Sequence, residues 1–178
     1  MGRTPADDRQ VSEGMSTAIE INDLHGNLGC RNSLLLANNA SARETSLLSR
    51  ERFDQLIARA SVAQFVVPAA GFLLAFEQSD DHDAGHFLWF RSRFGRFLYI
   101  DRVVVAEEHR RRGLARMLYA AVFQRATRLG HAHIVCEVNL MPPNPASDHF
   151  HATQGFEEVG RATIDEGAKT VRYLCAKV

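Results

Sequence analysis

The stretch over residues 97–130 constrains the fold of this chain more than any other part of the sequence. Its beginning, FLYIDRVVV, is dense in β-branched and aromatic residues, which favours a buried strand. Its end predicts a helix, because apolar residues recur at helical spacing and Gly130 follows as a helix-ending glycine. Those apolar residues are Leu114, Met117, Leu118, Ala121, Val122 and Leu129. The stretch therefore predicts a strand, a short charged loop and a helix.

The loop between strand and helix has the character of an anion site. Arg110, Arg111 and Arg112 precede Gly113, which allows the backbone to approach a ligand closely. The N–H groups of the first helical turn lack intrahelical acceptors, and the helix dipole adds positive potential there. The loop lacks both the Gly-Lys-Ser/Thr ending of a Walker loop and a G-x-G-x-x-G fingerprint. It predicts a phosphate-bearing ligand of another kind, although a plain turn with solvated arginines is the structural alternative.

Two linked motifs resemble the GNAT superfamily of N-acetyltransferases. The first is Arg110-x-x-Gly113-x-Ala115, which is similar to that family's acetyl-CoA pyrophosphate loop, Gln/Arg-x-x-Gly-x-Gly/Ala. After a second predicted strand over 133–139, NPASDHFHATQGF at 144–156 is similar to the family's Asn-x-x-Ala/Ser-x-x-Phe-Tyr-x-x-x-Gly-Phe helix. The order and distance of the motifs match the family. The resemblance covers residues 19–178, with specific motifs only over 100–156, and the segment around Asn38 and Glu44 also resembles an uncharacterised bacterial GNAT subgroup.

The resemblance implies a fold and a reaction. The fold would be the α/β GNAT fold, a mixed and mostly antiparallel sheet with helices on both faces. The reaction would move the acetyl group of acetyl-CoA, a cosubstrate, to a primary amine of a small-molecule or amino-acid-like acceptor by direct attack in a ternary complex. The alternatives are a non-catalytic CoA-binding or sensing domain and a peptide or protein N-acetyltransferase. A homodimer is a further expectation from the family.

The resemblance also assigns residues to the cofactor. The loop amides and arginines would hold the phosphates, the strand would lie along the pantetheine arm, and Asn144 matches the family's pantetheine-contacting asparagine. The expected cofactor-binding residues are Val103, Val104, Val105, Arg110, Arg111, Arg112, Gly113, Leu114, Ala115, Arg116, Asn144 and Ser147.

Three residues are catalytic candidates. Asp101 is a carboxylate within an apolar strand, where burial would raise its pKa toward that of a base; a structural bridge to Arg102 or binding of the substrate ammonium is the alternative. His151 occupies the position of the family's tyrosine acid and could protonate the thiolate, or it could be an exposed helix residue. Asn139 could orient the thioester carbonyl or simply end a strand. Further candidates are Glu137 and Glu44 as bases, and Tyr99 and Tyr119 as hydroxyl donors.

Three more residues are expected near the acceptor: Asn39, Glu44 and Trp89. His86 and Phe90 could join them, although aromatic residues before a strand are more often core. The acidic loop over 79–85, SDDHDAG, resembles a metal site only superficially and is expected to be a solvated loop. We therefore expect no metal.

Composition limits the classes of partner and compartment. Lys+Arg and Asp+Glu are both 21, so the chain lacks the basic excess of a non-specific nucleic-acid binder. Cys30, Cys136 and Cys175 are odd in number and lack Cys-x-x-Cys spacing, which argues against disulfides or zinc and for the cytoplasm. No apolar run suggests a membrane span or a signal peptide. We expect neither nucleic acid nor membrane as a partner.

The rest of the chain is predicted from local patterns. Residues 1–18 are polar and predict a disordered leader, or an extension upstream of a start at Met15; residues 19–178 predict one domain. Leu34, Leu35 and Leu36 suggest a short first strand, and Ser49 a cap for a helix over 50–60. Residues 62–67 and 71–77 predict a hairpin, and 157–163 and 170–177 a closing strand pair with a turn at 165–167.

Overall fold

The computed structural model describes residues 19–164 and 169–178, so the expected leader and the turn at 165–167 lie outside the described residues. The described strands form one sheet in the order β1-β2-β3-β4-β5-β7-β6. Neighbours are antiparallel except for β4 and β5, which are parallel. The strands are β1 (Ile21–Asp23), β2 (Val62–Val66), β3 (Gly71–Glu77), β4 (Phe97–Val105), β5 (His133–Met141), β6 (Glu157–Ile164) and β7 (Lys169–Lys177). The predicted mixed, mostly antiparallel sheet is confirmed.

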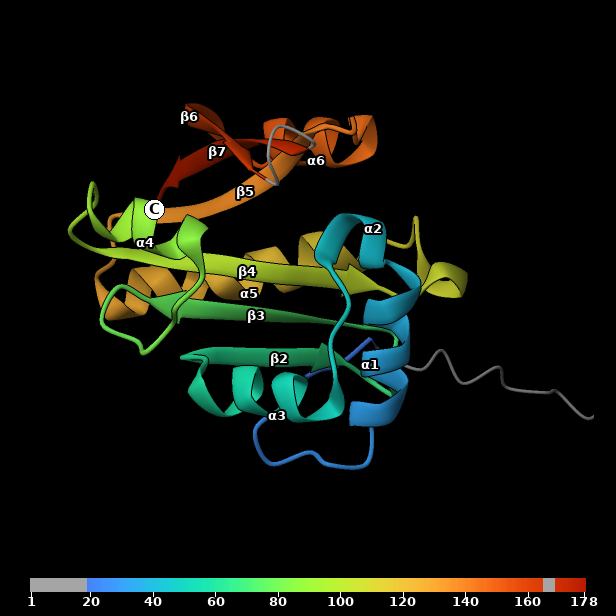
Figure 1. Cartoon of the computed structure of the whole chain (residues 1–178). Helices are drawn as coiled ribbons and strands as arrows, with labels where there is room; N and C mark the ends of the chain where they lie inside the picture. Colours follow the sequence, from blue (N-terminus) through green and yellow to red (C-terminus); the bar gives the residue numbers. More distant parts are fainter. Residues whose placement is uncertain (1–18, 165–168) are drawn as a thin grey trace, which may run out of the picture.

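Helices cover both faces of this sheet, as Figure 1 shows. Helices α1 (Arg31–Ala40), α3 (Arg50–Arg59) and α4 (Gly85–Arg91) pack on one face, where Phe53, Phe72 and Phe90 share a core. Helix α5 (Leu114–Leu129) covers the other face through Leu118 and Val122, and Phe150 of α6 (Pro145–Thr153) packs against that second core. The short α2 (Ala42–Thr45) and the 3-10 turn η1 (Glu107–His109) complete the chain. In the described part, no helix is long and apolar enough to cross a membrane.

Several local predictions are confirmed. The Ser49 hydroxyl accepts the N–H of Arg52 at 3.2 Å and begins α3. Strands β2 and β3 form the predicted hairpin, and β6 and β7 the closing pair. Helix α5 runs between Gly113 and Gly130, both in the left-handed conformation. Strand β6 is an edge of the sheet, but the homodimer expected from the family stays a prediction.

The first strand was predicted in the wrong place. It is β1, and Leu34, Leu35 and Leu36 belong to helix α1. Leu34 is fully buried whereas Leu36 is 72% exposed, as helical spacing requires. Two polar residues of this helix are buried, Arg31 and Asn38, and the Asn38 side chain bonds to Arg102 of β4. The apolar pattern of the helix is therefore interrupted, which is why the sequence suggested only a short strand at Leu34, Leu35 and Leu36.

Two irregularities of the sheet create the site. Strand β4 pairs with β5 only through Phe97–His133, Leu98–Ile134 and Tyr99–Val135, after which the two parallel strands diverge. On its other side, β4 has Ile100 opposite Ala75 and Arg102 opposite Leu74, so Asp101 is an extra residue in a β-bulge. Because a bulge redirects the side chain of the extra residue, Asp101 does not follow the alternation of its strand.

Candidate active site

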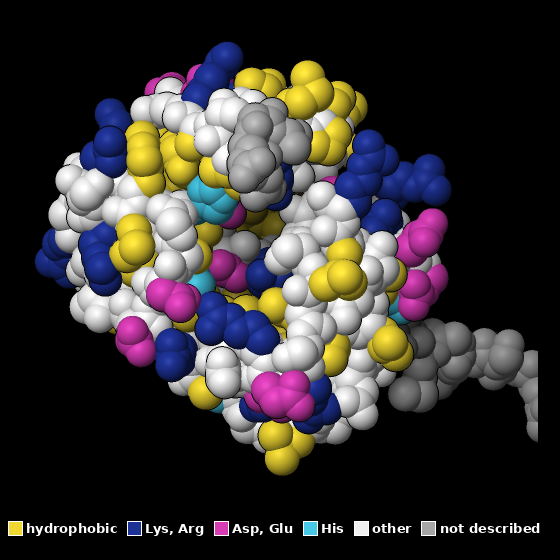
Figure 2. Space-filling model, in the orientation of Figure 1, with side chains coloured by type: hydrophobic (Ala, Val, Ile, Leu, Met, Phe, Trp, Pro, Cys, Tyr) yellow, Lys and Arg dark blue, Asp and Glu magenta, His cyan; other side chains and the backbone are white. Residues whose placement is uncertain are grey.

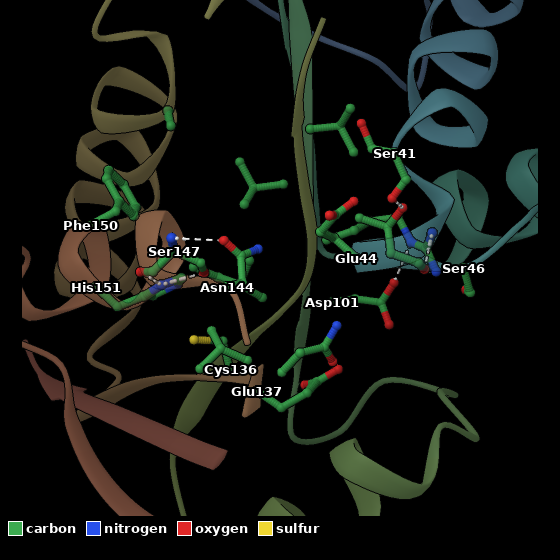
Figure 3. Close-up of a pocket in the computed structure, with 18 of the residues that line it drawn as sticks. Ser41, Glu44, Ser46, Asp101, Cys136, Glu137, Asn144, Ser147, Phe150 and His151 are labelled. Carbon is green, nitrogen blue, oxygen red and sulfur yellow. Dashed lines mark hydrogen bonds and ion pairs between the residues drawn. The ribbon is translucent and has the colours of Figure 1, made fainter. Parts of the chain in front are cut away.

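A cleft of about 570 Å³ opens where β4 and β5 diverge. Figure 2 shows a hollow near the centre of this face of the molecule. In Figure 3, the segment after α1 forms one wall, α6 forms the opposite wall, and β5 supplies the floor between them. The labelled residues are Ser41, Glu44 and Ser46 on the first wall, Asn144, Ser147, Phe150 and His151 on the second, and Cys136 and Glu137 on the floor, with Asp101 of β4 below the first wall.

The loop before α5 has the backbone of an anion site. Arg111 and Gly113 both have positive φ angles, of 60° and 78°, and α5 begins at Leu114. Turns of this kind direct successive N–H groups into a common concavity, at the positive end of the helix. A Cβ atom on Gly113 would meet no atom within 4 Å, so the backbone conformation rather than crowding favours glycine here.

The arginine side chains of this loop are not equivalent. Arg110 lies at the end of the cleft and donates to the Val105 carbonyl at 3.2 Å and to the Ser41 hydroxyl at 3.1 Å. Arg112 lies 3.1 Å from Nδ1 of His109. Arg111 and Arg116 are exposed around the start of the helix, whereas the side chain of Leu114 is buried in the core.

The walls of the cleft fit an extended ligand that carries amides. Six of the residues expected to bind the cofactor line it: Val103, Val104, Val105, Ala115, Asn144 and Ser147. Asn144 caps α6 by accepting the N–H of Ser147 at 3.1 Å. Because β4 and β5 no longer pair beyond Tyr99, their facing backbone groups are available to such a ligand.

Asp101 has the partners of a structural bridge. Its Oδ1 lies 3.0 Å from Nε2 of His82 and its Oδ2 accepts from Nε of Arg102 at 2.9 Å. Burial acts to raise its pKa, but the hydrogen bond from His82 and the charge of Arg102 outweigh burial and lower it. The carboxylate is therefore ionised and both of its oxygens are occupied.

Glu137 has the opposite electrostatic character. It faces the cleft from β5, and its Oε2 accepts the hydroxyl proton of Tyr99 at 2.8 Å. Desolvation and the nearby Asp101 raise the pKa of Glu137 to about 8, against the hydrogen bond from Tyr99 and the charge of Lys169. This carboxyl group can exchange a proton near neutral pH.

His151 is buried rather than exposed, at 5% accessibility. Its Nδ1 lies 2.8 Å from the Ser147 carbonyl oxygen, which can only accept, so Nδ1 carries a proton. Burial lowers the pKa of His151, so the ring is neutral and its Nε2 accepts the Tyr119 hydroxyl at 2.8 Å. Both Tyr119 and His151 line the cleft.

The structure brings together some of the expected acceptor residues and not others. Asn139 and Glu44 both line the cleft, and so does His86. Trp89 instead stacks on Tyr173, with ring centroids 4.1 Å apart, and lies outside the cleft-lining set. The side chain of Asn39 bonds to both backbone groups of Leu48 and is also outside that set.

The acidic loop over 79–85 is more ordered than a solvated loop. Asp80 accepts from the N–H groups of Ser61 and Glu77, and His82 is 4% exposed and stacked on Phe76 at 3.9 Å. Asp81 and Asp83 face solvent. The bridge from Arg102 to Asp101 was the alternative that the sequence offered, whereas the contact of His82 with Asp101 was not expected, because it depends on a pairing that only the fold creates.

Comparisons with known proteins agree with this geometry. The sequence model of the acetyltransferase (GNAT) family matches residues 33–156. No curated protein matches the chain in sequence. Ard1 from Thermoplasma volcanium has the same fold, with a TM-score of 0.72 and 15% identity over 90% of this chain and 98% of that one.

Two other structures are similar. A GNAT family acetyltransferase from Elizabethkingia anophelis, solved with acetyl-CoA bound, gives a TM-score of 0.62 and 15% identity over 90% of this chain and 98% of that one. The IAA acetyltransferase of Bacillus cereus gives 0.61 and 12% identity over 90% and 100%. Because the family model spans well over half of the sequence, the chain belongs to the GNAT family of acetyltransferases, which use acetyl-CoA.

Proposed function

We propose that this chain acetylates a primary amine of a small-molecule or amino-acid-like acceptor by direct attack within a ternary complex, with Glu137 as the general base. The observation that carries the proposal is the placement of Glu137. Its carboxyl group faces the cleft, bonds to Tyr99 at 2.8 Å and has a pKa of about 8. General bases work best with a pKa near the working pH.

Acetyl-CoA supplies the thioester that is attacked. The backbone of 111–115 would hold its phosphates, with Arg110, Arg112 and Arg116 nearby. The strand residues Val103, Val104 and Val105 and the capping residue Asn144 would hold the pantetheine arm against the cleft wall. In this arrangement the thioester would lie between β4 and β5, beside Cys136 and Glu137.

The chemical steps follow from the floor of the cleft. The Glu137 carboxylate takes a proton from the acceptor ammonium, and the amine nitrogen then attacks the thioester carbonyl carbon. A C–N bond forms while the electron pair moves to the carbonyl oxygen. Collapse restores the carbonyl and breaks the C–S bond, with its electron pair passing to sulfur. The second proton lost by the attacking nitrogen passes to this thiolate or to water, which gives the amide and CoA. Asp101, our sequence candidate for the base, receives no proton in this scheme because His82 and Arg102 occupy both of its oxygens.

Direct attack is favoured over an acyl-enzyme by the state of Cys136. This thiol lines the cleft but is only 2% exposed, and burial raises its pKa well above the ordinary value. The reactive form of cysteine is the thiolate. Cys136 therefore lacks the ionised sulfur that an acyl-enzyme route would need.

The wall formed by Tyr119 and His151 faces the departing sulfur in our proposal. Nε2 of neutral His151 accepts a hydrogen bond from the Tyr119 hydroxyl. Burial raises the pKa of Tyr119 well above its ordinary value, so this hydroxyl keeps its proton. A thiol has a pKa near 8.5, so the thiolate is a competent leaving group and can take up its proton after the C–S bond has broken. We assign to the Tyr119 hydroxyl a hydrogen bond to that thiolate, which it makes by turning away from Nε2 of His151, and to His151 the positioning of that hydroxyl. Asn139 is assigned the orientation of the acceptor or the carbonyl oxygen.

The test begins with thermal unfolding of the full chain with and without acetyl-CoA. Saturation at a hundredfold over Kd stabilises by about 2.7 kcal/mol, which is visible as a raised Tm. Thiol release is then followed with amino acids, diamines and tetrapeptides, because similar folds include an IAA acetyltransferase and a NatC complex bound to a Gag peptide. Release with a small amine supports the proposal, release with peptides alone overturns the acceptor class, and the absence of a Tm shift overturns the cofactor site.

A further inference from the structure

A series of buried polar contacts lies beside the floor of the cleft. His82 Nε2 lies 3.0 Å from Asp101 Oδ1, and Arg102 Nε donates to Asp101 Oδ2 at 2.9 Å. The three side chains are 2%, 8% and 9% exposed. Burying charged groups costs free energy even when they are paired, so this arrangement is an expensive way to stabilise a fold.

Arg102 extends this series to the wall opposite α6. Its Nη1 donates to the Asn38 side-chain oxygen at 2.9 Å and to the Thr45 carbonyl at 3.2 Å. Thr45 belongs to the segment 41–46, whose Ser41, Glu44, Thr45 and Ser46 all line the cleft. Asn38 in turn donates to the Ser46 carbonyl at 3.1 Å. A single guanidinium group thus connects the bulge of β4 to α1 and to the end of α2.

We propose that His82, Asp101 and Arg102 form a positioning device that fixes segment 41–46 against β4 and so orients the acceptor amine toward Glu137. The inference rests on the proposed function, because it takes Glu137 as the base. It assigns no proton transfer to the three residues. His82 aligns Asp101, Asp101 aligns Arg102, and Arg102 holds the wall that the acceptor contacts.

The same device acts on Glu137 through its charge. The pKa of Glu137 is affected by Asp101 and Tyr99 from β4, by Lys169 from β7 and by its own backbone. Three further titratable groups interact electrostatically with Glu137: Tyr119 of α5, Tyr173 of β7 and the neighbouring Cys136. Among these, Asp101 is a carboxylate that stays ionised, since its partners lower its pKa. A fixed negative charge beside Glu137 disfavours ionisation of the base.

Arg102→Lys tests the positioning role, with Arg31→Lys as a matched control. Arg31 is similarly buried and also bonds a carboxylate, Asp54, and three backbone carbonyls, but it does not line the cleft. The probe is the amine with the fastest thiol release from the amino-acid, diamine and tetrapeptide panel. We expect Arg102→Lys to raise the KM for this amine about tenfold, as expected for losing charged hydrogen bonds, with the KM for acetyl-CoA nearly unchanged. Equal effects of the two variants on both KM values would overturn the inference.

Asp101→Asn and two variants of His82 test the other two residues of the positioning device. Removing the Asp101 charge should move the acidic limb of kcat/KM down by about one pH unit. His82→Gln keeps an N–H donor and should retain a low amine KM, whereas His82→Leu should raise it. If the acidic limb of kcat/KM does not move in Asp101→Asn, or if the two His82 variants have equal KM values for the amine, the proposed positioning device is wrong.

Glu137→Gln separates this inference from the proposed function. If Glu137→Gln keeps full activity, the assignment of the base fails and the positioning device fails with it. If Glu137→Gln is inactive while Arg102→Lys and Asp101→Asn behave like Arg31→Lys, only the positioning device is wrong.

Discussion

The hydroxyl group of Tyr119 on α5 lies 2.8 Å from Nε2 of His151 on α6, and both side chains are almost completely buried. Their rings also meet edge to face, with centroids 5.6 Å apart. The pair occupies the wall where the GNAT pattern places a tyrosine on α6, so a hydroxyl group reaches this wall from another helix. The histidine that stands in place of the motif's tyrosine is therefore bonded to a tyrosine from another helix.

This pair should show energetic coupling. Either Tyr119→Phe or His151→Leu leaves a buried polar atom without its partner, which should cost about 1–3 kcal/mol of stability. The double variant should cost less than the sum of the two, because it removes both members. Chemical denaturation of the four proteins measures this coupling, and strict additivity would show that the hydrogen bond does not form.

Glu137 should make stability depend on pH in a specific direction. Its pKa in the folded state is about 8, above the value of about 4.3 for an unfolded chain, so the fold favours the neutral carboxyl group. The stabilisation is complete below the unfolded pKa and is lost as pH rises through about 8.

Between pH 5 and pH 8, the wild type should therefore lose about 1–3 kcal/mol more stability than Glu137→Gln; partial exposure to the cleft keeps the loss below the full shift. The lowered pKa values of His131 and His151 act in the opposite direction and are common to both proteins, so they cancel. Parallel stability curves would show that Glu137 is not desolvated.

Gly113→Ala should weaken binding of acetyl-CoA. Alanine at a φ of 78° costs about 1 kcal/mol, so the loop relaxes away from the conformation that aligns its N–H groups. Gly155→Ala is the matched control, because Gly155 has a φ of 80° and equally open surroundings but lies outside the loop. Calorimetric titration should show a weaker Kd only for the Gly113 variant, and equal Kd values would remove the loop from the cofactor site.

Cys136→Ala should leave turnover within a few-fold of the wild type. The buried thiol keeps its proton, so direct attack does not require it. Steady-state thiol release and alkylation by iodoacetamide check both points. Loss of turnover by several orders of magnitude, together with a trapped acetyl thioester on Cys136, would instead establish an acyl-enzyme.

The sequence predicted the parts of the molecule that depend on local patterns. The turn at Gly113, helix α5, the Ser49 cap and the β2–β3 hairpin follow from glycine conformation, capping and apolar spacing. The cleft-lining residues Val103 and Asn144 came from the family motif. These features are encoded within a few residues of one another.

The rest depends on contacts between distant residues. Helix α1 was taken for a strand because its inner face carries Asn38, which is stabilised by Arg102 of β4. For Asp101 the sequence left a base and a bridge to the adjacent Arg102 both open, because the bulge and the partner His82, which decide between them, leave no trace in the local sequence. Glu137 was only an alternative, since its neighbours Tyr99 and Asp101 come from another strand.

The most direct test of the proposed reaction is the pH dependence of kcat/KM for the wild type and Glu137→Gln, measured by thiol release with the best amine of the panel. Activity of the wild type should rise with pH through about 8, because the base must be ionised to accept a proton. In Glu137→Gln, kcat/KM should fall about 10²–10⁴-fold, and its pH profile should no longer show the rise that depends on Glu137. The Kd for acetyl-CoA should stay unchanged. A Glu137→Gln enzyme with wild-type activity and the same acidic limb would contradict the assignment of Glu137 as the base.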